Sequence, residues 1–200
     1  MAMTESKLKQ QLCEVSGRLY ERGLISSRGG NVSARLPGKS EFWITGNQAD
    51  KFQVLTRDLV KVSVSGRKIK GVRNPSIETP FHSAIYRTRH DVNAVVHAHN
   101  PVTMALALAG IRLKPQTVET KYYLKKVGTV GFAEPGSKAL AHHVGKQIAR
   151  ANTLILYGHG VVGVGSGLIE AEHLVELLEE AAITQLASSL VLSQRRRVPG

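Results

Sequence analysis

Residues 95–101, VVHAHNP, are the stretch of sequence that is most informative about the fold and the chemistry of this chain. Apolar β-branched residues followed by a turn signal are typical of a short buried strand. Side chains two residues apart in a strand point to the same face, so His97 and His99 are expected side by side, where two imidazoles can share one metal ion. A buried pair satisfied by hydrogen bonds and a pH-sensitive surface pair are the alternatives.

The pattern on either side of this strand alternates between extended and helical segments. We predict helices over residues 5–22, 80–90, 101–109, 135–150 and 168–192, with a frayed tail over 193–200. Strands are predicted over 31–35, 41–45, 59–64, 93–99 and 129–132, and two more within LILYGHGVVGVG, residues 154–165. No repeat or low-complexity linker interrupts the pattern, so we expect a single layered α/β domain over residues 1–200.

Composition narrows the class of protein. Of the 200 residues 42% are hydrophobic, which excludes a disordered chain, and 27 basic against 15 acidic residues give a formal net charge of +12. That charge favours an anionic ligand, either nucleic acid or a phosphorylated metabolite. The chain has no long apolar run and its start does not resemble a signal peptide, so we expect a cytoplasmic protein without a membrane partner.

Two further residues extend the histidine pair into a candidate active site. His159 lies between glycines in YGHGVVG and offers a third imidazole, although a plain turn is the alternative. Three histidines with an open fourth position are typical of catalytic zinc. Glu78 precedes a proline at a predicted helix start, one helix before the histidine strand, and is a candidate general base as well as an ordinary helix-start glutamate. The remaining histidines are predicted on the surface or on helix faces: His82, His90, His142, His143 and His173.

Two loops are candidates for binding an anion. SSRGGNVS, residues 26–33, joins a helix to a strand, and its glycines allow successive backbone N–H groups to face an anion, with Asn31 and Ser33 as further donors. ITGN, residues 44–47, and Ser76 can add more donors. Each loop is also explained as an ordinary turn.

Taken together, six motifs resemble the class II aldolase/adducin family: GGNVS, ITG, PSIETPFHSAIY, VVHAHNP, FAEPGS and YGHGVVGVG. This family includes L-fuculose-1-phosphate aldolase, L-ribulose-5-phosphate 4-epimerase and methylthioribulose-1-phosphate dehydratase. The resemblance implies a three-layer α/β/α fold with a largely antiparallel central sheet. It also implies a divalent metal, usually zinc and otherwise manganese or cobalt, held by His97, His99 and His159.

The resemblance assigns further roles by position. Glu78 falls on the family's acid/base position, where the fuculose-type aldolases have glutamate and the epimerases aspartate. Tyr122 and Tyr123 lie near the expected place of the catalytic tyrosine. Ile77 stands where the aldolases have the second serine of a Ser-Ser pair. The positions that bind the substrate phosphate are Gly30, Asn31, Thr45, Gly46 and Ser76.

The implied function is a metal-dependent aldolase of carbohydrate metabolism, a lyase that cleaves a ketose 1-phosphate resembling L-fuculose 1-phosphate. The products are dihydroxyacetone phosphate and an aldehyde. The metal polarises the carbonyl, and Glu78 moves a proton to or from the enediolate. A phosphosugar dehydratase of the methylthioribulose-1-phosphate type, a decarboxylase or an epimerase is the alternative on the same scaffold. The family also implies a homotetramer with its sites at subunit interfaces.

Unrelated classes fit the sequence less well. Gly158, Gly160 and Gly163 match a dinucleotide-binding GxGxxG, but the motif continues into VGVG rather than into a helix. The basic stretches GRKIKGVR and RRR lack the interleaved aromatics of a nucleic-acid platform, so we expect no nucleic-acid partner. A non-catalytic adducin-like protein is disfavoured because all three histidines are present.

Overall fold

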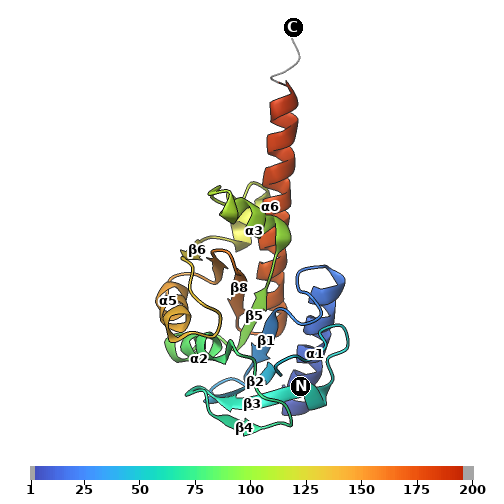
Figure 1. Cartoon of the computed structure of the whole chain (residues 1–200), viewed down its shortest axis with the longest axis vertical. Helices are drawn as coiled ribbons and strands as arrows, with labels where there is room; N and C mark the ends of the chain where they lie inside the picture. Colours follow the sequence, from blue (N-terminus) through green and yellow to red (C-terminus); the bar gives the residue numbers. More distant parts are fainter. Residues whose placement is uncertain (1–2, 196–200) are drawn as a thin grey trace.

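An eight-stranded sheet organises the chain (Figure 1). The computed structural model describes residues 3–195. The strand order is β4-β3-β2-β1-β5-β8-β7-β6, and all neighbours are antiparallel except β6 and β7, which are parallel. The strands are β1 Asn31–Ala34, β2 Glu41–Thr45, β3 Leu59–Ser63, β4 Lys68–Lys70, β5 Ala94–Ala98, β6 Val127–Val130, β7 Thr153–Leu156 and β8 Gly160–Gly165. The largely antiparallel sheet confirms that part of the fold prediction.

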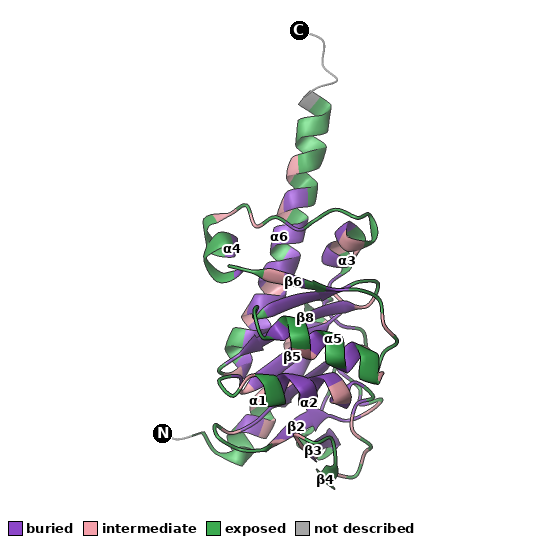
Figure 2. Cartoon of the chain, turned by 90° about the vertical axis from the view of Figure 1, so that its left-hand side faces the viewer, coloured by how far each residue is buried: buried purple, intermediate pink, exposed green. Residues whose placement is uncertain are grey.

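Helices cover both faces of the sheet, so the fold has the three layers that were predicted. One layer holds α1 (Glu5–Glu21), α3 (Pro101–Leu108) and α6 (Leu168–Arg195), with the short α4 (Val118–Tyr123) against α6. The other layer holds α2 (Thr79–Thr88) and α5 (Lys138–Ile148), which pack against each other. The buried residues gather in the strands between the layers, and α6 extends beyond them into an exposed segment (Figure 2).

Each face of the sheet carries its own core because alternate strand residues point in opposite directions. On β5, Val96 packs with α1 and α6, whereas Val95 packs on the side of α2 and α5. Asn31 pairs with His97 across β1 and β5, so both side chains lie on the α2 side. The helix α6 approaches β8 so closely that a Cβ at Gly163 would lie 2.5 Å from the Ala171 carbonyl oxygen. The glycines of GVVGVG therefore permit close packing of helix on sheet.

The predicted boundaries differ from the structure in a few places. The sequence pattern missed β4 and α4, and a short 3₁₀ helix at Thr56–Asp58, because these elements are exposed or too short to show a period. Ser137 caps α5 by accepting from the Leu140 amide, so this helix starts after residue 135. The helix α6 continues to Arg195, and the rest of the predicted frayed tail, residues 196–200, lies outside the described residues. None of the helices within residues 3–195 has the length and apolar character to span a membrane.

Candidate active site

The three predicted histidines meet at one end of β5. His97 is the penultimate residue of β5, and His99 follows the strand, held by its amide donating to the Leu24 carbonyl at 2.7 Å. His159 lies in the turn between β7 and β8. Their ligand nitrogens all lie within 4.8 Å of one another, and the Nε2 atoms of His97 and His99 are 3.2 Å apart.

A glycine makes this convergence possible. A Cβ at Gly160 would lie 2.3 Å from the Ala98 carbonyl oxygen and 2.9 Å from both the His97 and His99 rings. Only glycine lets the start of β8 approach the end of β5 this closely. Gly160 thus serves the histidine cluster, and the GxGxxG pattern continues into strand β8 rather than into a helix.

The donor set suits a divalent cation. His97 directs Nδ1 at the Val161 carbonyl oxygen, 2.9 Å away, so a neutral His97 donates there and turns the lone pair of Nε2 toward His99 and Glu78. Lone pairs and a carboxylate that face one another repel unless a cation or a proton lies between them. Two nitrogens that share an ion at about 2.0–2.1 Å lie roughly 3.3 Å apart, close to the spacing of the two Nε2 atoms. His97, His99 and His159 could therefore hold a metal.

Glu78 reaches this cluster from the start of α2. Its backbone is the N-cap, but its side chain makes no capping bond. The carboxylate instead lies 3.0 Å from Nε2 of His97 and 3.0 Å from Nε2 of His159, and it accepts from Nδ2 of Asn31 at 2.8 Å. The structure thus brings the predicted acid/base residue into contact with two of the three histidines.

The charges of the cluster are strongly coupled. Burial alone would raise the pKa of Glu78, but attraction to His97 and hydrogen bonding to His159 hold this pKa well below its usual range. Burial opposes protonation of His97, yet Glu78 more than compensates and raises the pKa of His97. Burial, followed by repulsion from His97 and His159, lowers the pKa of His99 to about 4. A negative carboxylate therefore lies among imidazoles, of which His99 is neutral at physiological pH.

A cavity of about 280 Å³ opens next to this cluster, and we call it the histidine cavity. Glu78, His99 and His159 line it. It is also lined by four of the five residues predicted to bind phosphate, which are Gly30, Asn31, Gly46 and Ser76. The fifth, Thr45, is fully buried and does not line the cavity, because its hydroxyl accepts from the Val32 amide. Ser33 is likewise fully buried, and its hydroxyl contacts His82 and Tyr86.

Sequence reasoning missed a lysine in the histidine cavity. Lys51 lines the cavity although only 2% of it is exposed, and within the described residues its ammonium has one hydrogen-bond acceptor, the Ala49 carbonyl at 3.1 Å. Burial, and then the charge of Arg73, lower the pKa of Lys51 to about 8. The neighbouring Gln48 also lines the cavity and is the one non-glycine residue between 3 and 195 with a positive φ, 55°. No motif marks these residues, since a lysine in a polar loop is usually solvated.

The structure corrects one histidine prediction and leaves the tyrosine unplaced. His82 was predicted on the surface or a helix face; it lies on α2, but on a face that is fully buried against β1 rather than exposed. Tyr122 and Tyr123 lie in α4, where Tyr123 packs its ring against His173 of α6, and neither lines the histidine cavity.

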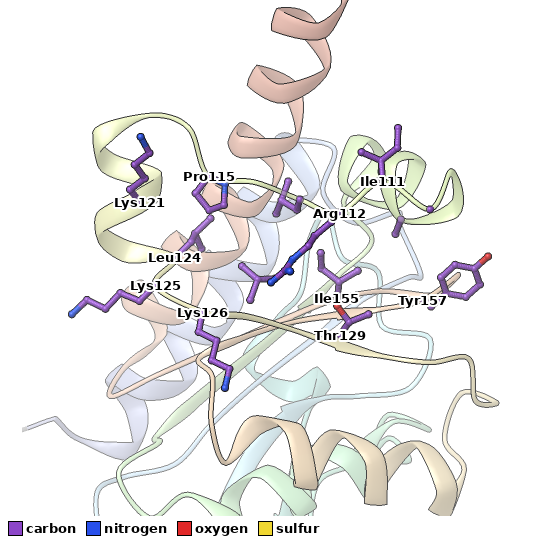
Figure 3. A pocket seen from close by; sticks show the side chains of 14 residues that line it. Ile111, Arg112, Pro115, Lys121, Leu124, Lys125, Lys126, Thr129, Ile155 and Tyr157 are labelled. Carbon is purple, nitrogen blue, oxygen red and sulfur yellow. The ribbon is translucent and has the colours of Figure 1, made fainter.

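A second cavity, of about 650 Å³, lies between α3, α4 and β6 (Figure 3). Arg112 extends into it, Tyr157 stands at its edge, and Lys121 and Lys125 point outward. Although it is larger, this cavity contains none of the three histidines and not Glu78. We therefore assign the chemistry to the histidine cavity.

Comparison with known proteins agrees with the fold. Residues 10–186 match the family model described as "Class II Aldolase and Adducin N-terminal domain". The chain belongs to the class II aldolase family. It is 35% identical over 183 residues to an L-fuculose phosphate aldolase of Methanocaldococcus jannaschii, covering 92% of this chain and 98% of that protein. It is 34% identical over 185 residues to a 3-oxo-tetronate 4-phosphate decarboxylase of Cupriavidus necator, covering 90% and 83%.

Solved structures give the same result. The L-fuculose-1-phosphate aldolase from Thermus thermophilus superposes with a TM-score of 0.86 at 30% identity, covering 98% of this chain and all of that one (100%). YgbL from Klebsiella pneumoniae, described as a putative aldolase/epimerase/decarboxylase, gives a TM-score of 0.87 at 30% identity, covering 93% and 91%. Family membership supports an enzyme of the lyase class. The names of the relatives specify different reactions, an aldolase reaction in some and a decarboxylation in others.

Proposed function

We propose that this protein is a divalent-metal-dependent lyase that cleaves a carbon–carbon bond in a phosphorylated ketose, with a ketose 1-phosphate as substrate and dihydroxyacetone phosphate and an aldehyde as products. The observation that carries the proposal is the Glu78 carboxylate, 3.0 Å from two imidazoles of a three-histidine cluster and beside a cavity. The names of the aldolase relatives support it.

The chain's own groups divide the reaction into two tasks, both of which fall to residues that line or adjoin the histidine cavity. A divalent ion on His97, His99 and His159, zinc by preference or else manganese or cobalt, would polarise the substrate carbonyl and stabilise the negative charge that develops on its oxygen. Glu78 lies where it can give a proton to the substrate carbon when the bond breaks, and remove that proton in the reverse direction.

A second set of residues that line the histidine cavity suits the phosphate. Lys51 is a buried cation whose one hydrogen-bond acceptor among residues 3–195 is the neutral Ala49 carbonyl, and a buried charge without a counter-ion is costly. A substrate phosphate in contact with the ammonium would supply the missing counter-charge. We assign Lys51 to phosphate binding together with Gly30, Asn31, Gly46 and Ser76, which line the same cavity. Thr45 does not line the cavity, but its hydroxyl accepts from the Val32 amide and so holds β1 and β2 together next to these residues.

A decarboxylase is the second candidate, because a relative of nearly equal identity is named 3-oxo-tetronate 4-phosphate decarboxylase. Both reactions break a carbon–carbon bond and leave the electron pair next to a carbonyl. They differ in the leaving group, which is an aldehyde in one and carbon dioxide in the other. The site described above serves either.

A substrate panel decides between the two. Metal-loaded protein is offered a set of ketose 1-phosphates and, separately, 3-oxo-tetronate 4-phosphates, and release of dihydroxyacetone phosphate and of carbon dioxide is measured. His97→Ala serves as the variant without the cluster, and bound metal is measured in both proteins. Dihydroxyacetone phosphate released from a ketose 1-phosphate, by the wild type and not by His97→Ala, supports the aldolase. Release of carbon dioxide together with dihydroxyacetone phosphate from a 3-oxo-tetronate 4-phosphate, with no cleavage of any ketose 1-phosphate, replaces it by the decarboxylase. Equal, negligible metal in both proteins removes the basis for either.

A further inference from the structure

A buried row of polar side chains leads from Tyr86, near the C-terminal end of α2, to Glu78 at the start of this helix. Its members are Tyr86 and His82 on α2 and Ser33 and Asn31 on β1, and none is more than 4% exposed. Only Asn31 lines the histidine cavity, so the other three have no access to a substrate there. A group of buried polar atoms in an otherwise apolar layer is costly unless every member is paired.

Consecutive contacts join the row to the carboxylate. The Tyr86 hydroxyl lies 2.9 Å from Oγ of Ser33, which lies 2.7 Å from Nδ1 of His82. Nε2 of His82 contacts Oδ1 of Asn31, and Nδ2 of Asn31 donates to Oε2 of Glu78 at 2.8 Å.

The chemistry of these groups allows one direction of donation. An ionised Glu78 can only accept, so Asn31 presents its NH₂ group to the carboxylate and its oxygen to His82. That oxygen can only accept, so His82 carries its proton on Nε2. Burial, and then the charge of His97, lower the pKa of His82 to about 3, so the ring is neutral and Nδ1 accepts from Ser33. Ser33 in turn accepts from Tyr86.

The orientation of Asn31 and the tautomer of His82 are therefore coupled. If His82 moved its proton to Nδ1, the bare Nε2 would face the Asn31 oxygen, and the amide would have to rotate. A rotated amide would turn its oxygen toward Glu78, where two acceptors repel. Tyr86 opposes this change as well: if Ser33 accepted from Nδ1, it would turn its own proton toward Tyr86, and the buried Tyr86 hydroxyl would lose Ser33 as the acceptor of its proton.

We propose that His82, held by Ser33 and Tyr86, is a positioning residue that fixes the Asn31 amide and through it the placement of the Glu78 carboxylate. The proposal rests on the role of Glu78 in the proposed function, but the geometry that carries it does not depend on which bond is cleaved. Replacing a group that orients a site residue by hydrogen bonding, without touching the substrate itself, typically lowers activity by about 10–100-fold.

The tautomer is tested first, by nitrogen-15 NMR of histidine-labelled zinc-loaded protein. The wild type should show one ring, absent from His82→Gln, that carries its proton on Nε2 and does not titrate between pH 5 and 9. A proton on Nδ1, or titration of this ring within that range, overturns the proposal. This measurement needs no turnover, so it tests the role of His82 even if neither proposed reaction is observed.

The functional test compares two replacements at one position. His82→Phe keeps a flat ring but removes the donor to Asn31, and kcat should fall about 10–100-fold, a larger factor than the rise in KM that the loosened Asn31 amide causes. His82→Gln places an amide N–H near the lost Nε2 and should recover most of that loss. His142→Gln, at an exposed position of α5, is the matched control and should behave as the wild type. If the glutamine variant is no better than the phenylalanine variant although both are folded, His82 serves packing alone and the proposal fails.

Discussion

Replacing Lys51 by methionine should have opposite effects on stability and on substrate binding. The side chain is buried to all but 2%, and methionine fills a similar volume without the charge. In the protein without substrate the charged ammonium lowers the free energy of unfolding, because among the described residues it has one hydrogen-bond acceptor, the Ala49 carbonyl. In the substrate complex the same ammonium is expected to pair with a phosphate. A gain in stability together with weaker substrate binding would therefore show that the Lys51 ammonium serves substrate binding rather than the stability of the fold.

The structure sets the size of the stability effect. Burial, followed by the charge of Arg73, lowers the pKa of Lys51 from 10.5 to about 8. This difference corresponds to about 3 kcal/mol. Loss of the bond to the Ala49 carbonyl offsets about 1 kcal/mol of this gain. Lys51→Met should therefore stabilise the free protein by about 2 kcal/mol, which raises Tm by roughly 4–8 °C in a chain of this size.

The pH dependence follows from the direction of this pKa change. The unfolded chain binds more protons than the folded protein between about pH 8 and 10.5, so wild-type stability rises with pH across that window. The advantage of Lys51→Met should be full below pH 8 and should disappear as the pH approaches 10.5. The wild type should also lose affinity for a phosphorylated substrate above about pH 8, as the free ammonium loses its proton.

Urea denaturation and steady-state kinetics measure the two effects. A hydrogen bond to a charged group contributes about 1.5–3 kcal/mol, so KM should rise roughly 10- to 100-fold. Lys68→Met, on the exposed strand β4, is the matched control and should change neither quantity. A variant at Lys51 that is less stable than the wild type, or that keeps the wild-type KM, would refute this account of the cavity.

Three further outcomes are expected. Glu78→Gln should lower turnover by about 10²–10⁴-fold and suppress exchange of the dihydroxyacetone phosphate C3 proton with deuterated water, while most bound metal is retained; wild-type exchange and cleavage would contradict the assignment. Gly160→Ala should abolish metal binding measured by elemental analysis, because its Cβ would lie 2.3 Å from the Ala98 carbonyl oxygen; normal metal content would show that the strands can separate there. Light scattering should show a homotetramer, and a fully active monomer at micromolar concentration would exclude it.

Local patterns in the sequence determined the elements and part of the site. The apolar pattern predicted a helix over residues 5–22, and its apolar positions Leu8, Leu12, Val15 and Leu19 are all buried in α1. The HxH strand predicted the histidine pair because the two-residue period of a strand is a local property. The adjacent Thr79-Pro80 likewise placed Glu78 at a helix start, and the structure has it as the N-cap of α2.

Tertiary structure alone decided which distant residues share the site. His159 and Glu78 meet the histidine strand because β8 pairs with β5 and α2 packs on β1, and no local pattern encodes these pairings. The same reason explains why the burial of His82 was not predicted. The period of α2 left this histidine on an unspecified face, and only the packing of α2 on β1 shows that the face is buried.

Lys51 shows the same limit for a charged residue. Its loop sequence is polar, and the composition of such a loop predicts solvated side chains. Burial of this ammonium results from the way the loop closes over the end of the sheet, where its amide donates to the Ser27 carbonyl of the glycine-rich loop. The sequence by itself thus determined the residue types for metal and proton chemistry, whereas the cavity, its buried cation and the hydrogen-bonded row behind Glu78 depend on contacts between segments far apart in the chain.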